Sequence, residues 1–251
     1  MSFSNPYLQC ESPHADVLSH ILAFVDALPS ASRACLSDPN VILKLAKTQL
    51  SLNIKGLGFK PFTLDFSAPE HQRKVTRSAL KHSLLARACQ AHLKPRIWDL
   101  TCGWGGDSFV LASTGSCVLS VERHPLVALM VQVAQSALQG GDHWHVVCSS
   151  AAAVLNDASL DSPDVLYLDP MFPAKPRGRC SGKAMQILAY LSEQFEAAPH
   201  PLLSAALSYP QVRRVVLKYP RKSKPPVTPD QVIQGRSIQF CIYHRHSTSR
   251  V

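Results

Sequence analysis

The chain has 251 residues, 46% of them hydrophobic, which is enough to bury a substantial core. No apolar run reaches the roughly 18 residues of a membrane-spanning helix, and the N-terminus lacks the basic-then-apolar pattern of a secretory signal. These features argue against a membrane or secreted protein and predict a soluble, cytoplasmic one.

The net charge of +9 is concentrated in the last third of the chain. Residues 1–170 carry 13 Lys and Arg against 14 Asp and Glu, whereas residues 171–251 carry 13 against 3. Two basic clusters, Lys175–Arg179 and Lys218–Lys224, each follow a predicted strand. They form either a solvated face or a contact surface for a polyanion, of which nucleic acid is the commonest.

The cysteines and histidines do not form a recognisable ligand pattern. Eight cysteines are scattered without a CxxC pair, so we interpret them as reduced thiols. The pairs His143/His145 and His244/His246 lack further ligands at a zinc-like spacing. We therefore expect neither disulfides nor a metal site.

Residues 1–88 are predicted to form an N-terminal extension or lid packed on the rest. In chain order they contain a helix at Ala15–Ala27, a mixed segment at Val41–Ile54, a strand-like segment at Phe62–Phe66 and a helix from about Ala68 towards Ala91. The last helix carries basic side chains at mostly three- and four-residue spacings: His71, Arg73, Lys74, Arg77 and Lys81. This stripe is either a solvated face or a second wall of a polyanion groove.

Residues 89–251 alternate between strand-like and helix-like segments. Strands are predicted at Arg96–Cys102, Ser116–Glu122, Trp144–Ser149, Asp164–Asp169, Arg214–Tyr219 and, completing an edge, Ser237–His244. Helices are predicted at Asp107–Ser113, Pro125–Leu138, in the alanine-rich stretch after Ser149, and within Lys183–Glu196 and Pro201–Leu207. Regular βαβ alternation predicts an α/β fold with a mostly parallel sheet.

A glycine-rich turn follows the first of these strands, with Gly103, Gly105 and Gly106 leading into a helix at Asp107. Glycines at such a turn let the backbone bend sharply and approach a nucleotide-like ligand. Glu122 ends the next strand, 19 residues after Gly103, where a carboxylate can accept hydrogen bonds from a ribose diol. The alternative is a turn that binds no ligand, with Glu122 capping the helix that begins near Pro125. A nucleotide ligand leaves two enzyme classes open, a nicotinamide oxidoreductase and an S-adenosylmethionine-dependent methyltransferase.

The stretch VLYLDPMFP favours the methyltransferase. It predicts a buried strand with Asp169, Pro170 and Phe172 just beyond its carboxyl end, where ligands bind in parallel sheets. The exocyclic amine of a base is a poor nucleophile because its lone pair is delocalised into the ring. A carboxylate and a backbone carbonyl that accept its N–H hydrogens can orient it, while an aromatic ring stacks on the base. Hydride transfer does not require these groups.

The motifs WDLTCGWGGDSFVLAS, VERHP, CSS and YLDPMFPAK, in this order and spacing, resemble the RsmJ family of 16S ribosomal RNA guanine-N2 methyltransferases. The resemblance implies a class I S-adenosylmethionine-dependent methyltransferase fold, Rossmann-like and mostly parallel, with a small N-terminal extension. By position, the donor contacts of the family fall on Gly106, Asp107, Glu122, Arg123, Ser149, Ser150 and Asp169. Gly106 stands where the family often has a larger residue.

Together, these patterns predict methyl transfer from S-adenosylmethionine to the N2 amine of a guanosine in 16S rRNA, free or in the small ribosomal subunit. Asp169 and Phe172 would position the base. No metal is expected, because the sulfonium is already an activated leaving group. Two alternatives stay open: an amino-methyltransferase of another nucleic acid, such as DNA adenine or another RNA, and a catalytically silent RNA-binding assembly factor.

Overall fold

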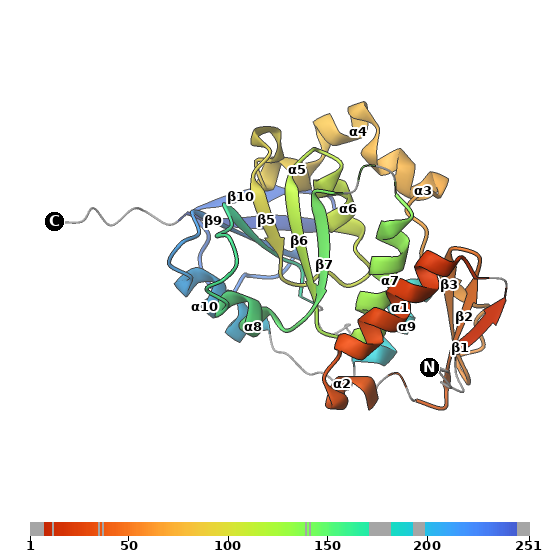
Figure 1. Cartoon of the computed structure of the whole chain (residues 1–251). Coiled ribbons are helices and arrows are strands. Elements are labelled where there is room, and N and C mark those ends of the chain that lie inside the picture. Colours follow the sequence, from red (N-terminus) through yellow and green to blue (C-terminus); the bar gives the residue numbers. More distant parts are fainter. Residues whose placement is uncertain are drawn as a thin grey trace.

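The structure, a computed structural model, describes residues 8–11, 13–34, 36, 38–138, 140, 142–170, 182–192 and 199–244. Two sheets organise these residues, one of seven strands and one of four. The larger sheet lies at the centre with helices on both faces, and the smaller one lies to one side, near the N-terminus (Figure 1).

The large sheet has the order β10-β11-β9-β8-β5-β6-β7. Its strands are β5 (Arg96–Asp99), β6 (Cys117–Glu122), β7 (Trp144–Cys148), β8 (Val165–Leu168), β9 (Arg214–Pro220), β10 (Gln231–Gln234) and β11 (Ile238–His244). Strands β5 to β9 are parallel to their neighbours in this group, whereas β11 runs antiparallel to β9 and β10. The chain adds β6 and β7 on one side of β5, then β8 and β9 on the other. The switch point between β5 and β8 is where doubly wound sheets bind ligands.

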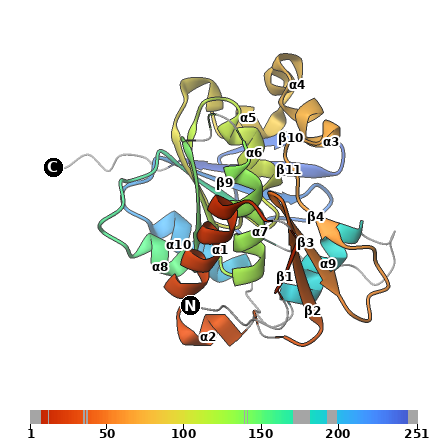
Figure 2. The same cartoon turned by 45° about the vertical axis from the view of Figure 1, so that its right-hand side comes forward.

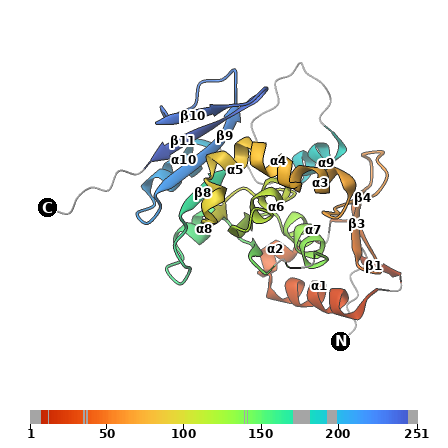
Figure 3. The ribbon, with the colours of Figure 1, turned by 90° about the horizontal axis from the view of Figure 1, so that it is seen from above.

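Helices lie on both faces of the large sheet (Figure 3), and each face has its own apolar core. One face packs against α5 (Leu84–Ala88), α6 (Gly106–Ala112), α7 (Pro125–Ser136) and α9 (Lys183–Ser192), and the other against α8 (Ala151–Leu155) and α10 (Pro199–Ser208). Helix α7 begins with Pro125 at its first turn and with the His124 side chain accepting from the Leu126 N–H. Most of its residues are buried, which suits a helix that is apolar on nearly all sides.

The N-terminal residues cover the outer side of α7. They form α1 (Ala15–Ala27), α2 (Ser30–Ala34) and the small sheet β1 (Leu8–Glu11), β2 (Val41–Ala46), β3 (Gln49–Ile54) and β4 (Phe62–Thr63). Both α1 and β3 contact α7, and Figure 2 shows the small sheet beside that helix. Alternate residues of β2 and β3 are buried, as expected for strands with one face on a core.

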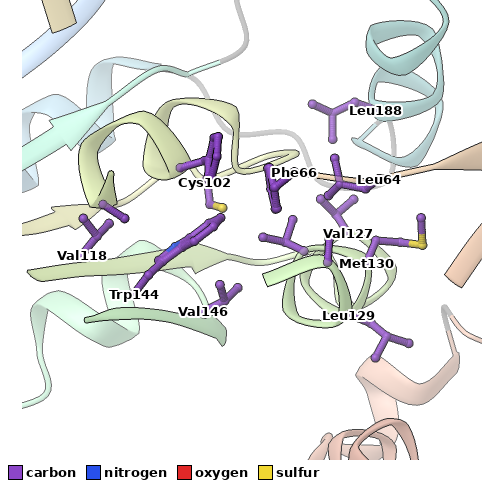
Figure 4. Packing of buried hydrophobic residues seen from close by; sticks show 14 of the residues in the cluster. Leu64, Phe66, Cys102, Val118, Val127, Leu129, Met130, Trp144, Val146 and Leu188 are labelled. Atoms are coloured by element: carbon purple, nitrogen blue, oxygen red, sulfur yellow. The ribbon is translucent and has the colours of Figure 1, made fainter. Parts of the chain in front are cut away.

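Two side chains after β4 join the extension to the main core. Leu64 and Phe66 lie among side chains of α7, the glycine-rich turn and α9 (Figure 4). The Phe66 ring centroid lies 5.0 Å from that of Phe109 on α6 and 5.1 Å from that of Trp144 on β7. This shared core favours our proposal that residues 1–88 are an extension packed on a body at residues 89–251.

The single helix predicted from about Ala68 to Ala91 is wrong. The segment is divided into α3 (Pro69–Gln72), η2 (Arg73–Val75), α4 (Arg77–His82), α5 and η3 (Ala91–Leu93). Thr76 and Ser83 have extended ψ angles, and their hydroxyl oxygens accept from the N–H groups of Ala79 and Ala86. Each therefore starts a new helix, because an N-cap residue leaves the helical conformation.

The predicted edge of the large sheet is also wrong. The strand predicted at Ser237–His244 exists, as β11, but it lies between β9 and β10. The edge strand is β10, which follows a proline-rich stretch at residues 225–229 and has no alternating pattern strong enough to predict.

Candidate active site

Four parallel strands end together at the switch point, and each brings one chemically important side chain. Asp99 ends β5, Glu122 ends β6, Asp169 follows β8 and Lys218 lies near the end of β9. The helix α6, which follows the glycine-rich turn after β5, adds Asp107.

The three glycines of the turn have different roles. Gly103 and Gly105 have φ angles of 53° and 73°, which favour glycine. A Cβ atom on Gly105 would lie 2.9 Å from Val131 Cγ1, so this glycine is required by packing. A Cβ on Gly106 would meet nothing within 4 Å, so the space beside this residue is open. Only at Gly106 does the structure leave room for a ligand or a larger side chain.

Substitutions at two of these glycines should differ in their effect on the free energy of unfolding. We expect Gly105→Ala to lower the free energy of unfolding by about 2–5 kcal/mol, since it combines a left-handed residue with overpacking. Gly106→Ala should change it by less than about 0.5 kcal/mol. Denaturant titration of both variants checks this, and equal effects would contradict the packing role of Gly105.

Glu122 is 9% exposed and already accepts from three backbone groups. Its Oε2 accepts from the Gly103 N–H at 2.8 Å, its Oε1 from the His124 N–H at 2.8 Å, and the Arg123 backbone is the third partner. Burial raises the pKa of its carboxyl, and these hydrogen bonds oppose that rise. Glu122 therefore fixes both the glycine-rich turn and the start of α7, and of the about four acceptor sites of a carboxylate one remains for a ligand hydroxyl.

Lys218 joins two carboxylates, in what we call the carboxylate–lysine cluster (Asp107, Tyr167, Asp169 and Lys218). Its Nζ donates to Asp107 Oδ2 at 2.8 Å and to Asp169 Oδ2 at 2.7 Å. Tyr167 OH also donates to Asp107 Oδ2, at 2.5 Å. Among the described residues, Oδ1 of Asp169 accepts no hydrogen bond. No described residue therefore competes with a substrate for this oxygen.

Burial and charge act against each other in the cluster. Burial raises the pKa of the Asp169 carboxyl, and the Lys218 ammonium opposes that rise. Burial alone would lower the pKa of Lys218, but the two carboxylates outweigh it and raise that pKa. Burial, followed by the charge of Asp107, raises the pKa of Tyr167, which keeps its phenol protonated as a donor.

Asp99 holds the glycine-rich turn and α6 through hydrogen bonds of its buried carboxylate. Its side chain is buried, with Oδ1 accepting from the Thr101 N–H and Oδ2 from the Ser108 hydroxyl. The Ser120 hydroxyl donates to Ser108, and Trp144 Nε1 donates to Ser120. This chain of hydrogen bonds ties β5, α6, β6 and β7 together beneath the turn.

Asp99 should make stability depend on pH. Burial raises its pKa from 3.8 to about 7, so between these values the folded state binds more protons than the unfolded state. Its stabilising contribution is thus present at low pH and lost as pH rises to about 7. Relative to Asp99→Asn, the parental protein should lose on the order of 1–4 kcal/mol of unfolding free energy from about pH 4.5 to pH 7.5. Parallel profiles in denaturant titrations would contradict this.

Aromatic side chains form a wall beside the turn. The rings of Phe62, on β4, and Trp104, in the turn, have centroids 4.6 Å apart. Trp104 Nε1 donates to the Ala184 carbonyl at the start of α9. The N-terminal extension and α9 thus meet at the glycine-rich turn.

Comparison with known proteins assigns this arrangement to a family. Residues 33–245 match a family model described as "Putative SAM-dependent methyltransferase". Ribosomal RNA small subunit methyltransferase J of Legionella pneumophila (strain Lens) is 34% identical, over 82% of this chain and 85% of its own length. The chain belongs to the ribosomal RNA small subunit methyltransferase J family. The Coxiella burnetii enzyme of that name is 32% identical, over 79% of this chain and 82% of its own.

A solved structure agrees in fold. A SAM-dependent methyltransferase of Neisseria gonorrhoeae is 25% identical and superimposes with a TM-score of 0.70, covering 96% of this chain and 97% of its own. The predicted fold class, a class I S-adenosylmethionine-dependent methyltransferase with a mostly parallel sheet, is confirmed. As a member of the methyltransferase J family, the chain uses S-adenosylmethionine as methyl donor.

The residues around the turn fit this donor. The open space at Gly106 lies next to Asp107, and the Glu122 carboxylate, which accepts from the Gly103 N–H, keeps one acceptor site. Ser149 and Ser150, which the family resemblance predicts to contact the donor, follow β7, beside β6. The Ser150 hydroxyl accepts from the Ala153 N–H as the N-cap of α8, which leaves its proton to donate. Arg123, half-buried, lies between Glu122 and His124.

Some predicted residues lie outside the part of the chain that the structure describes. These are Phe172 and the cluster Lys175–Arg179. Their proposed contacts with the base and with a polyanion stay predictions. Six cysteines lie in the described residues, and no disulfide joins any of them there.

Two functional residues were missed or misassigned. The sequence places Lys218 in a basic cluster, either a solvated face or a polyanion surface, but in the structure its side chain pairs with Asp107 and Asp169. The sequence indicates for Tyr167 only a place in a buried strand, whereas its hydroxyl donates to Asp107. One signal could have identified Lys218 as a site residue. It lies within the apolar run VVLKY, in a strand predicted to belong to the same sheet.

Among the described residues, no group of three or more His, Cys, Asp or Glu side chains is arranged to hold a metal ion. None of the helices there is long and apolar enough to cross a membrane.

Proposed function

We propose that this chain transfers a methyl group from S-adenosylmethionine to the N2 amine of a guanosine in 16S rRNA of the small ribosomal subunit. The observation that carries the proposal is the Asp169 carboxylate. Lys218 holds one oxygen of Asp169 at 2.7 Å, while the other oxygen accepts no hydrogen bond from the described residues. Membership of the methyltransferase J family supports the choice of small-subunit RNA.

The free oxygen of Asp169 suits an exocyclic amine. An N–H donated to a carboxylate orients the nitrogen lone pair towards the methyl group and favours the positive charge that develops on nitrogen. The Asp169 backbone is held as well, because its N–H donates to Thr101 Oγ1 at 2.6 Å. We infer that the site works by positioning and charge, with Phe172 as the stacking platform for the base.

S-adenosylmethionine supplies a methyl group on a sulfonium, which is already a good leaving group. We infer that the chain's task towards this donor is to hold it. Gly103, Gly105 and Gly106 shape the turn, and Asp107, Glu122 and Arg123 surround it. The ribose hydroxyls would donate to Glu122, and Ser149 and Ser150 would face the adenine.

Basic side chains beside the site favour an RNA partner. Arg73, Lys74, Arg77 and Lys81 are exposed on η2 and α4, and Arg221, Lys222, Lys224 and Arg236 are exposed around β9 and β10. These two sets are neighbours, because α4 contacts α5, which contacts β10 and β11. His71 does not belong to this surface, because its ring packs against the ring of Phe66, with the two centroids 5.4 Å apart. We infer that the surface meets RNA phosphates in the cytoplasm.

The first test is mass spectrometry of ribosomal RNA from cells with and without the gene. The second is an assay in which the purified protein and labelled donor are incubated with isolated small subunits, free 16S rRNA, other RNA or DNA. The proposal requires N2-methylguanosine at one position of 16S rRNA, lost with the gene and restored by the purified protein. Methylation of another nucleic acid, or no methyl transfer to any substrate, would refute it.

A further inference from the structure

We propose that Lys218 is a positioning residue for this reaction, holding Asp169 as an ionised acceptor at a fixed distance from Asp107. The inference rests on the proposed function, because it assigns a task to Asp169. It gives Lys218 a role in the chemistry that is distinct from contact with RNA phosphates.

Strand register brings the charges of this cluster together. Leu168 on β8 pairs with Leu217 on β9, so the next residues, Asp169 and Lys218, lie beside each other. Side chains alternate along a strand. Leu168 and Leu217 belong to the core on the α8 and α10 side, which directs Asp169 and Lys218 to the opposite face, towards α6 and Asp107.

The cluster needs a cation. From the described elements around Lys218, the ionisable groups that face it or its partners are Asp107 on α6, Tyr167 and Asp169 on β8, Asp99 on β5 and, directly after α5, the buried thiol of Cys89. Three of these are carboxyls, and Lys218 is the one cation that pairs with them among the described residues. Without it, two carboxylates would share a partly buried site and at least one would favour its proton.

A phosphate-binding role fits Lys218 poorly. Its side chain is 23% exposed, against 32% for Asp107 and 36% for Asp169, and its ammonium already donates to both carboxylates. Tyr167 fixes Asp107 from the other side. Lys222, four residues later, is exposed and takes part in no ion pair among the described residues, which makes it a matched control for loss of a lysine charge.

The first experiment measures ionisation without RNA. In protein labelled with ¹³C at aspartate carboxyl carbons, the Asp169 signal is assigned by its loss in Asp169→Asn and followed against pH. In Lys218→Met its midpoint should rise by about 1–3 pH units, in Lys218→Arg by less, and in Lys222→Met not at all. Circular dichroism checks folding, and Lys218→Gln replaces Lys218→Met if that variant does not fold. An unchanged midpoint in the folded variant would overturn the inference.

The second experiment measures single-turnover methyl transfer to small-subunit RNA at saturating donor across pH. The acid limb of the Lys218→Met profile should move to higher pH, with activity recovering towards the parental rate at alkaline pH, and Lys218→Arg should restore much of the difference. An equal loss at every pH would indicate a merely structural role and refute the inference. No N2-methylguanosine from the parental protein would refute the proposed function instead, while the carboxyl titration would still test Lys218.

Discussion

Asp169→Ala should lower the single-turnover rate of methyl transfer by about 100- to 1000-fold at saturating donor, the usual cost of removing one preorganised charge-stabilising group. The folded state should persist, because the carboxylate is 36% exposed and its backbone N–H, not its side chain, is bonded to Thr101. Rapid-quench assays with small-subunit RNA check the rate. Asp142→Ala, which removes an exposed carboxylate, serves as the matched control.

Asp169→Asn separates orientation from charge. The amide keeps an acceptor oxygen but loses the negative charge, so partial activity would mean that orientation dominates. Near-complete loss would mean that the charge stabilises positive charge on the attacking nitrogen. A folded, donor-bound Asp169→Ala protein that methylates at the parental rate would refute the mechanism altogether.

Glu122→Ala should weaken binding of S-adenosylmethionine and of its demethylated product by about 10- to 150-fold, which corresponds to roughly 1.5–3 kcal/mol for a lost charge-assisted acceptor. The variant also leaves the N–H groups of Gly103 and His124 without their partner, so thermal stability should fall as well. Calorimetric titration measures the affinity, and scanning calorimetry the stability.

Glu122→Gln distinguishes these two roles. Its amide keeps one acceptor oxygen but places an NH₂ group opposite a backbone donor. Glu122→Gln should therefore restore less than half of the thermal stability that Glu122→Ala loses. Glu70→Ala removes an exposed carboxylate and is the control for charge. Unchanged donor affinity in a folded Glu122→Ala protein would remove Glu122 from the binding site.

Local patterns in the sequence were enough to predict the body of the fold and the position of the site. Apolar strands alternating with helices determine a parallel sheet, and the residues at their carboxyl ends then share one edge. Glu122, at the end of one strand, and Asp169, just beyond another, were found in this way, whereas Asp107 was assigned by the resemblance to the RsmJ family. The reason is physical: periodicity and glycine turns act over a few residues, and parallel pairing leaves few ways to assemble them.

Tertiary structure alone decided how those residues are used. Glu122 accepts from the Gly103 N–H because the turn after β5 folds over β6, and Gly105 is needed because Val131 of α7 approaches it. In the sequence, Lys218 is one basic residue of a basic segment. The pairing of β9 with β8 places it beside Asp169, and Asp107 on α6 accepts its second hydrogen bond. Such roles depend on contacts between residues as much as 111 positions apart, which no local pattern encodes. The sequence thus determined which chemistry this chain carries, and the packing of its elements determined which side chains position it.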